Sequence, residues 1–593
     1  MTSTLREVEP DPTVVSPNSA VRRRIFTPFG GISGVVVLAM AFITLGPLIA
    51  VAWRALAGGG DEGNIVTDVT SIQELPQVLL NTLVLVIAAG AASLLIGGAL
   101  AWLSVRTDAG MGLFSDAMPM VPYLLPPIAG AVAWTMLLSP GAGFINAWLR
   151  DFVGIFGVEM SDGPFNIYSW FGLILVMTIY QVPYAFLLIS AGLRNMDSTL
   201  EEQSRVSGVG LGGTFFRVTL PALTPSIAGA ALLVTWSGLA LYSVPAVIGT
   251  GANIKVLTVL IVEQLTTYTP SRTGAAVGLS LIMVALIGVV WFIQSVALRR
   301  GRFASISGKA RAATPLRLGR WRGVARVCMI GYAVVTTGLP VLALVLVTLN
   351  GYWTPNLKWA DFSLDPFFDT VLGSSRAAES LQNSLGLGLV GATIGITAAA
   401  VIALFVARLP VRLGRVIDGA LKLPPTMSHI VLAVGFVLLF AGPPFRLSGT
   451  VVILLLAYIA LYFPQGSVAA DGAVVQIGKD LPEASAVSGA SESTTFRKIY
   501  LPLMLPGLIA GWTLLFVRIV GDLTASAILA GPGNPVVGRQ ILEIYQNGSF
   551  AQLAALATAL TIVTTVLVII AMLVQKRTSR WSSSTSTVIT TTN

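Results

Sequence analysis

The sequence predicts an all-α polytopic membrane protein with about 12 transmembrane helices, arranged as two parallel six-helix repeats. Of its 593 residues 54% are hydrophobic and only 11% are charged, whereas about 25% of the residues of a soluble protein are charged. The apolar residues are grouped in runs of about 20 or more, the length that crosses the hydrocarbon core of a bilayer. A polar loop that follows the fourth apolar run recurs after the tenth, which indicates an internal duplication.

Twelve apolar segments are long enough to form one span each. They start near residues 31, 77, 116, 167, 219 and 275 in the first half, and near 324, 380, 418, 449, 501 and 551 in the second. The first segment follows Arg22, Arg23 and Arg24, and no small-residue cleavage site follows a short apolar core. We therefore expect a retained span rather than a removed signal peptide.

The distribution of basic residues predicts that both termini are cytoplasmic. With this topology 26 of the 36 Lys and Arg residues lie on the cytoplasmic side, 8 on the outer side and 2, Lys422 and Arg518, within spans. Such an excess on the cytoplasmic side is the positive-inside pattern. Nine of the basic residues fall between residues 299 and 326, and we interpret this stretch as a solvated hinge near anionic lipid headgroups rather than as a nucleic-acid site.

These features divide the chain into five parts. The expected boundaries are a disordered cytoplasmic tail at 1–24, a first repeat at 25–298 with its core at 77–298, a basic cytoplasmic linker at 299–323, a second repeat at 324–577 with its core at 380–575, and a Ser/Thr-rich cytoplasmic tail at 578–593 that we also expect to be disordered.

The duplication is clearest in the two polar loops. Residues 200–230 match residues 481–511 at a constant offset of 281, with eleven identical positions that include Glu202/Glu483, Gly208/Gly489 and Pro221/Pro502. Upstream, Asn81 and Arg106 match Asn383 and Arg408, and the Pro126-Pro127 pair matches Pro424-Pro425. Six spans separate each feature from its copy, so both copies lie on the same side and the repeats are parallel.

Each polar loop is predicted to contain a short surface helix. Thr199 and Glu202 form a capping-box pattern in the first loop, and Asp480 with Glu483 forms the matching pattern in the second. A glycine six residues after each glutamate permits a turn. A Leu-Pro pair, Leu220-Pro221 or Leu501-Pro502, then begins the next span, where proline costs little.

The second loop resembles the EAA loop of the inner-membrane permeases of binding-protein-dependent ABC importers, in the segment Glu483-Ala484-Ser485 and at Gly489, Leu501 and Pro502. The first copy departs from it, because Glu202-Gln203-Ser204 replaces Glu-Ala-Ala. The resemblance implies the type I importer permease fold in the bacterial plasma (inner) membrane. It also implies an extracytoplasmic binding protein and two copies of a cytoplasmic ATPase, which dock on these loops. The coupling residues that it implies are Glu202, Gly208, Leu220, Pro221, Glu483, Ala484, Gly489, Leu501 and Pro502.

The substrate class is suggested by other segments. "GFINAWL", "PFNIYSWFG" and "YSVPAVIG" in the first half and "GDLTASAILAG" in the second resemble fused permeases that include iron(III) transporters, and thiamine permeases have the same layout. Iron(III) is therefore the first expectation. Thiamine or another small organic solute is the alternative.

A few polar residues within the spans are candidates for the translocation path. Arg518 and Asp522 are four residues apart, which would allow an ion pair on one helical face. An isolated Arg near the bilayer centre costs about 2.5–3.5 kcal/mol, so such residues usually pair or face water. The pair is either structural, at an outer gate, or part of the path that senses an ionic substrate. Further candidates lie beside Pro183 and Pro464, namely Tyr180, Gln181, Tyr462 and Gln465.

Several function classes are disfavoured. One Cys and one His argue against a disulfide framework, a zinc site and His-based catalysis, and we expect no cofactor, no resident metal and no enzyme activity. No Gly-x-x-x-x-Gly-Lys-Ser/Thr loop occurs, so ATP hydrolysis is assigned to separate subunits. An ion-driven secondary transporter is the remaining alternative, although it normally needs several acids within its spans.

The outer segment 143–157 is predicted to be an interfacial helix. Phe144, Trp148, Phe152 and Phe156 recur along it at helical spacing. Contact with a binding protein is the alternative for this segment.

Overall fold

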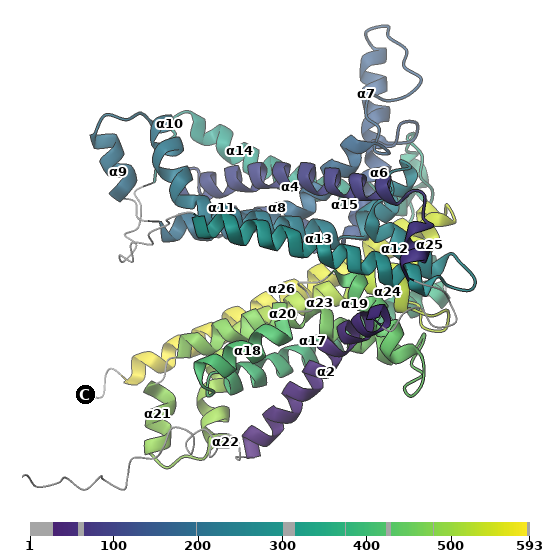
Figure 1. The fold of residues 1–593 in the computed structure, drawn as a ribbon. Coiled ribbons are helices and arrows are strands. Elements are labelled where there is room, and N and C mark those ends of the chain that lie inside the picture. Colours follow the sequence, from purple (N-terminus) through teal and green to yellow (C-terminus); the bar gives the residue numbers. More distant parts are fainter. Residues whose placement is uncertain are drawn as a thin grey trace, which may run out of the picture.

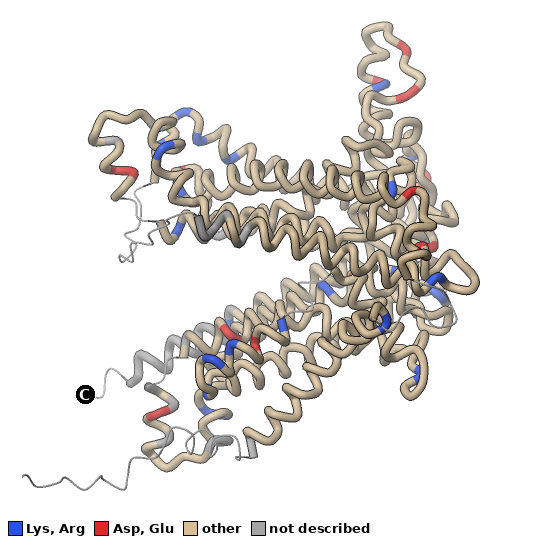
Figure 2. The backbone as a smooth tube through the Cα atoms, viewed as in Figure 1, with Lys and Arg blue, Asp and Glu red and all other residues tan. Residues whose placement is uncertain are grey.

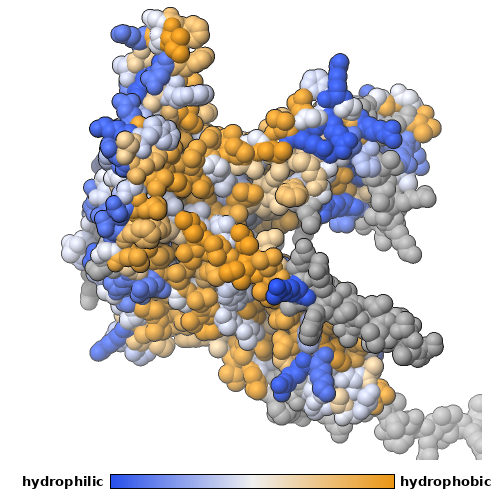
Figure 3. Space-filling view, turned by 180° about the vertical axis from the view of Figure 1, so that it is seen from behind, coloured by the Kyte–Doolittle hydropathy of each residue, from blue (hydrophilic) through white to orange (hydrophobic). Residues whose placement is uncertain are grey.

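The computed structural model describes residues 28–56, 65–196, 199–300, 315–373, 375–422, 428–477 and 480–589. Within these ranges the secondary structure is helical. Two arms of long helices diverge from a common end, which gives the molecule the shape of a V (Figure 1). The space-filling view shows an apolar surface over the middle of the molecule and an open space between the arms (Figure 3).

Each arm is built from four long helices. The first arm contains α4 (Leu75–Arg106), α8 (Trp170–Asn195), α11 (Leu220–Ala240) and α13 (Thr273–Arg300), and the second contains α17 (Ser375–Val406), α20 (Val451–Ile477), α23 (Leu501–Val520) and α26 (Phe550–Ile589). The middle parts of these helices carry few charged residues, and most charges lie toward the helix ends and in the loops (Figure 2). This distribution suits a surface that faces lipid.

Shorter helices connect the arms and fill their common end. They are α3 (Ile65–Thr70), α5 (Leu113–Ala117), η2 (Met118–Leu124), α6 (Pro127–Leu138), α7 (Phe144–Gly154), η4 (Pro245–Gly249), α12 (Leu257–Thr266), η6 (Trp359–Asp361), α16 (Asp365–Phe368), η7 (Asp369–Gly373), α18 (Val411–Lys422), α19 (His429–Phe436), η9 (Val437–Ala441), α24 (Thr524–Leu529) and α25 (Val537–Gln546).

Ten of the twelve predicted spans are continuous helices of sufficient length and apolarity within the described residues. The third predicted span is instead a pair of helices, Phe114–Leu124 and Pro127–Leu138, which meet at 88°. Pro126 and Pro127 lie at this bend. Proline interrupts the helical hydrogen bonds, which accounts for the break between the two helices. In the ninth segment α18 and α19 flank residues 423–427, so the matching Pro424-Pro425 pair lies outside the described residues.

Matching hydrogen bonds support the internal duplication. The Asn81 side chain donates to the Lys255 carbonyl at 3.0 Å, and its copy Asn383 donates to the Pro535 carbonyl at 2.9 Å. The neighbouring hydroxyls act in the same way: Thr82 accepts from the Leu257 amide at 2.9 Å, and Ser384 accepts from the Val537 amide at 2.8 Å. In both halves a polar pair on the long helix thus holds the start of the following short helix, α12 or α25.

The first helix of each repeat packs against the other repeat. α2 (Pro28–Leu56) lies on the second arm, where Phe42 contacts the Phe440 ring at 5.8 Å. α14 (Trp321–Ala333) lies on the first arm, where Ala325 and Met329 join a buried cluster with Leu100 and Phe186. η5 (Val334–Gly338) and α15 (Leu339–Asn350) continue α14 toward the common end. The two repeats are therefore interlocked.

The structure describes little of two segments expected at the domain boundaries. The whole tail at 1–24 lies outside the described residues, and so does most of the linker at 299–323. α26 continues to Ile589. The backbone of the Ser/Thr-rich segment up to that residue is therefore helical, whereas we expected it to be disordered.

Candidate functional sites: the two polar loops and the interface between the repeats

The two polar loops have the same local structure. The first contains α9 (Thr199–Val206), α10 (Leu211–Thr214) and the π-helical turn η3 (Phe215–Thr219), and the second contains α21 (Asp480–Val487), α22 (Glu492–Thr495) and η10 (Phe496–Tyr500). The Ser204 and Thr214 hydroxyls are hydrogen bonded at 3.0 Å, and their copies Ser485 and Thr495 at 2.8 Å. Each hydroxyl pair ties the surface helix to the helix that re-enters the arm.

A left-handed glycine ends each surface helix. Gly208 has a φ of 81° and Gly489 a φ of 76°, a conformation that glycine adopts without steric cost. This is the turn predicted from the spacing. The residues that precede α9 and α21, at 197–198 and 478–479, lie outside the described residues, so the two capping patterns remain predictions.

Both loops lie at the same end of the molecule, at the tips of the two arms (Figure 1). Glu202, Gly208, Glu483, Ala484 and Gly489 are exposed. Two apolar residues, Val206 and its copy Val487, are exposed as well, each to 90%. The Leu-Pro pairs are the first residues of α11 and α23. The membrane-length helices, however, begin earlier, at Gly212 and Phe496, and run through η3 and η10, so each pair lies within its span rather than at its start.

A buried network fixes the first loop to its arm. Arg106, the last residue of α4, lies 3.8 Å from Glu201, and both side chains are less than 10% exposed. Thr219 donates a hydrogen bond of 2.6 Å to the same carboxylate. Sequence reasoning missed Glu201, because the position that matches it at offset 281 is Pro482 and the repeat draws attention only to Glu202.

At the interface between the repeats, Arg518 contacts residues of the opposite half. Its Nη2 donates to the Tyr184 hydroxyl at 3.2 Å, and its guanidinium carbon lies 4.4 Å from the centre of the Tyr123 ring. The predicted ion pair with Asp522 is not formed. α23 ends at Val520, and Gly521 turns the chain away, so Asp522 does not continue the helical face that carries Arg518.

Asp522 instead stabilises the start of α24. One carboxylate oxygen accepts from the Tyr462 hydroxyl at 2.6 Å, and the other accepts from the backbone amides of Ala525 and Ser526 and from the Ser526 hydroxyl. The residue is 5% exposed. Its negative charge is therefore spread over four donors, which is how a buried carboxylate is accommodated.

Tyr180 contacts the bend at Pro126. Its hydroxyl donates to the carbonyls of Leu125 and Pro126 at 3.3 and 3.4 Å. The Pro126 carbonyl also accepts from the Gly130 amide at 3.0 Å, as in a regular helix. Gly130 makes room for the Tyr180 contact, because a Cβ there would lie 1.8 Å from the Tyr180 oxygen. The bend touches the second half, where a Cβ on Gly521 would lie 3.1 Å from Pro126.

The remaining predicted path residues have different surroundings. Gln181 is fully buried against Gly238 of α11, and neither of its amide atoms has a hydrogen-bond partner. Gln465 is half-buried, and its amide oxygen has no partner. His429 packs edge-on against Tyr462, with ring centres 5.6 Å apart. In the described part of the chain, no group of three His, Cys, Asp or Glu residues is arranged to hold a metal.

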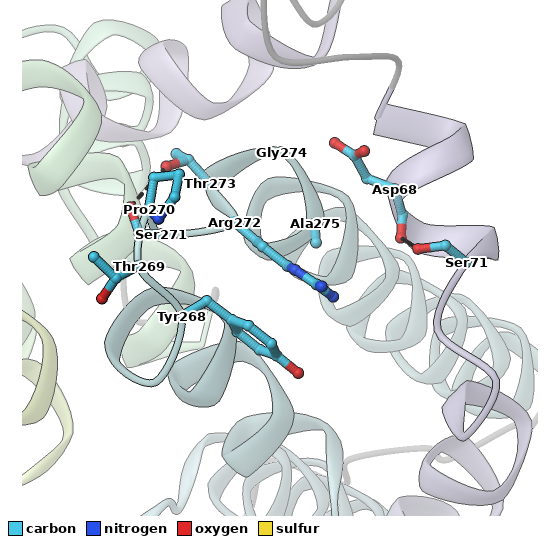
Figure 4. Close-up of a pocket in the computed structure, with 10 residues that line it drawn as sticks. All are labelled: Asp68, Ser71, Tyr268, Thr269, Pro270, Ser271, Arg272, Thr273, Gly274 and Ala275. Carbon is cyan, nitrogen blue, oxygen red and sulfur yellow. Dashed lines mark hydrogen bonds between the residues drawn. The ribbon is translucent and has the colours of Figure 1, made fainter.

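The opposite end of the molecule carries an open pocket of about 610 Å³, lined by α3 and the loop between α12 and α13 (Figure 4). The Arg272 guanidinium stacks on the Tyr268 ring at 4.1 Å.

Just before α12, Lys255 bonds to Glu263 at 3.1 Å and to Glu74 at 3.2 Å. Burial opposes its charge, but these two hydrogen bonds raise the pKa of Lys255 above its ordinary value. The ammonium therefore remains charged.

α7 also lies at this end and runs across the direction of the long helices (Figure 1). Trp148, Phe152 and Phe156 are 74%, 54% and 71% exposed. This orientation and exposure suit the predicted interfacial helix.

Comparisons with known proteins agree with these features. The chain is 23% identical over 492 residues to the ferric transport system permease protein FbpB of Actinobacillus pleuropneumoniae, which covers 82% of this chain and 69% of that protein. It is 23% identical over 521 residues to the probable ABC transporter permease protein y4fN of Sinorhizobium fredii, an alignment that covers 84% of this chain and 88% of that protein. It is 25% identical over 239 residues to the spermidine/putrescine transport system permease protein PotC of Haemophilus influenzae, an alignment that covers 40% of this chain and 91% of that protein.

A family match covers more than half of the chain and occurs once in each repeat, at residues 93–302 and 391–583. Both matched ranges contain one of the two polar loops and its surface helix. Together with the ten membrane-length helices, this makes the protein a multi-pass transport subunit of the inner membrane. The chain belongs to the family of inner-membrane components of binding-protein-dependent transport systems.

Proposed function

We propose that this chain is the complete transmembrane unit of an ATP-driven importer of iron(III), with both termini in the cytoplasm. The observation that carries the proposal is the pair of loops that share sequence, hydrogen bonds and glycine turns and lie together at one end of the molecule. The ferric substrate is taken from the similarity to ferric transport permeases, which extends over most of this chain.

The coupling residues are proposed to form two docking sites, one for each copy of the ATPase. α9 and α21 present exposed glutamates, together with Val206 and Val487, whose apolar surface is costly to leave in water. Burial of these valines against the ATPase would stabilise the complex. Leu220-Pro221 and Leu501-Pro502 lie near the loop ends of the helices that would carry the motion into the arms.

The path is proposed to run between the two arms and past the bend at Pro126. A binding protein on the outer side delivers the substrate, and ATP closes the two ATPase subunits. The arms then exchange between two states whose populations depend on ATP and on the loaded binding protein. Arg518, Asp522, Tyr180 and Tyr462 would line or support this path where the two halves meet. Gln181 and Gln465 would supply further polar groups on α8 and α20.

The test uses Gly489→Asp in the complex reconstituted with its ATPase and binding protein. A Cβ at Gly489 meets nothing within 4 Å, and Asp tolerates left-handed backbone better than most residues. The variant should therefore insert and purify normally, while ATP-driven uptake of radioactive iron falls at least tenfold. Gly548→Asp is the matched control, since Gly548 has a φ of 74° and is equally open but lies between α25 and α26 at the other end of the molecule. Normal uptake by Gly489→Asp would contradict the docking role.

Two alternatives are separated by the same reconstituted system. Uptake of thiamine or another organic solute in place of iron would change the substrate but keep the mechanism. Uptake that persists without ATP and follows an imposed ion gradient would indicate a secondary transporter.

A further inference from the structure

Among the residues that the structure describes, Arg518 has no carboxylate partner at the place where the two halves meet. Its contacts are the Tyr184 hydroxyl and the Tyr123 ring, which are both neutral. Lys422, the other basic residue predicted within a span, is bonded at 2.6 Å to both Asp418 and Asp471. The charge of Lys422 is thus cancelled locally, whereas that of Arg518 is not.

The acid nearest to Arg518 in the sequence is not paired with it. The Asp522 carboxylate is satisfied by Tyr462 and by the first turn of α24, and it is buried. Arg518 itself is only half-buried. The guanidinium is therefore more accessible than the carboxylate.

The bend at Pro126 adds to the positive field. α6 begins at Pro127, and the N-terminal end of a helix carries partial positive charge. The carbonyls that precede it would contribute negative charge, but those of Leu125 and Pro126 are covered by the Tyr180 hydroxyl. Pro126 also packs beside Gly521, close to Arg518 in the chain.

The fold does not require this charge. At offset 281 Arg518 corresponds to Ser237 and Asp522 to Leu241, and the first repeat builds the same helix without either charged group. A group that is costly to bury and that the equivalent helix lacks points to a role in transport rather than in folding.

We propose, on the basis of the function proposed above, that Arg518 makes the passage selective for iron(III) carried as a neutral or anionic complex with phosphate or carboxylate ligands. A bare trivalent cation is repelled by the guanidinium, and so is an organic polycation. Arg518 is then a specificity-determining residue, because phosphate and carboxylate oxygens are the groups that a guanidinium binds best.

The experiment measures ATP-driven uptake of ⁵⁵Fe by the reconstituted complex, with iron supplied with ³²P-phosphate or with ¹⁴C-citrate. Arg518→Gln should lower the initial rate at least tenfold, and Arg518→Lys, which keeps the charge, should retain at least half of it. Tyr184→Phe removes the same hydrogen bond but leaves the guanidinium, and it should lower the rate less than threefold. One of the two labelled anions should enter together with the iron.

The outcomes separate this inference from the proposed function. If the wild-type complex imports iron and Arg518→Gln imports it equally well, the inference is overturned while the function stands. Equal losses in Arg518→Gln, Arg518→Lys and Tyr184→Phe would assign the effect to the hydrogen bond and would also overturn it. If the wild type imports spermidine rather than iron, both proposals fail. Basal ATPase activity and a monodisperse elution profile confirm that each variant is folded.

Discussion

Asp522 shows how one buried charge depends on a few donors. Tyr462→Phe removes the shortest of the hydrogen bonds to the Asp522 carboxylate, at 2.6 Å, and leaves this group buried. Loss of a hydrogen bond to a charged group costs about 1.5–3 kcal/mol, so we expect a lower thermal unfolding midpoint for the purified protein. Tyr458→Phe is the matched control, because Tyr458 lies on the same helix, is equally buried and bonds only to the neutral Ser526 hydroxyl at 3.2 Å.

The control should lose less stability than Tyr462→Phe. Equal shifts of the two midpoints would mean that the carboxylate does not depend on the Tyr462 hydroxyl. Both variants should still bind detergent and elute as the wild type does, since neither changes the apolar surface.

At the scale of elements, the two glutamates at the start of α9 have separate roles. Glu201 belongs to the buried network with Arg106 and Thr219, whereas Glu202 is exposed. Glu201→Ala should therefore loosen α9 on its arm, because it removes a carboxylate from beside a buried guanidinium. We expect faster amide hydrogen exchange over Thr199–Val206 in this variant.

Glu202→Ala provides the control for that measurement. It should leave hydrogen exchange in α9 unchanged within twofold, but it should weaken stimulation of the ATPase by the loaded binding protein. Faster exchange in both variants, or in neither, would contradict this division of roles.

The surface helices of the coupling loops could be predicted from the sequence because each occurs twice. The glycine turns were confirmed. The predicted starts of the spans at the Leu-Pro pairs were wrong, because both helices begin earlier and continue through the pairs. Glu201 could not be found in this way, since its copy position is Pro482. The Arg518–Asp522 ion pair was predicted wrongly because periodicity does not indicate where a helix ends. The prolines at 126 and 127 signalled a break, but its angle of 88° depends on the contacts that surround it.

At the scale of the whole molecule, the first helix of each repeat packs against the other repeat. The backbones of α2 and α19 are in close contact, since a Cβ on Gly435 would lie 2.4 Å from the Pro47 carbonyl oxygen. On the other side, Arg326 of α14 donates to the Ala109 carbonyl of the first repeat at 3.3 Å. We therefore expect the two repeats to remain associated without the covalent connection between them.

Cleavage of the chain between the repeats tests this interlocking. With a protease site inserted within residues 301–314, the two fragments should remain together through gel filtration in detergent, because α2 and α14 each hold the opposite fragment. Gly435→Ala should lower the temperature at which the cleaved fragments separate, since a backbone carbonyl cannot swing away as a side chain can. Gly442→Ala, where a Cβ meets nothing within 4 Å, should leave that temperature unchanged. Separation of the wild-type fragments immediately after cleavage would show that the exchanged helices do not hold the two repeats together.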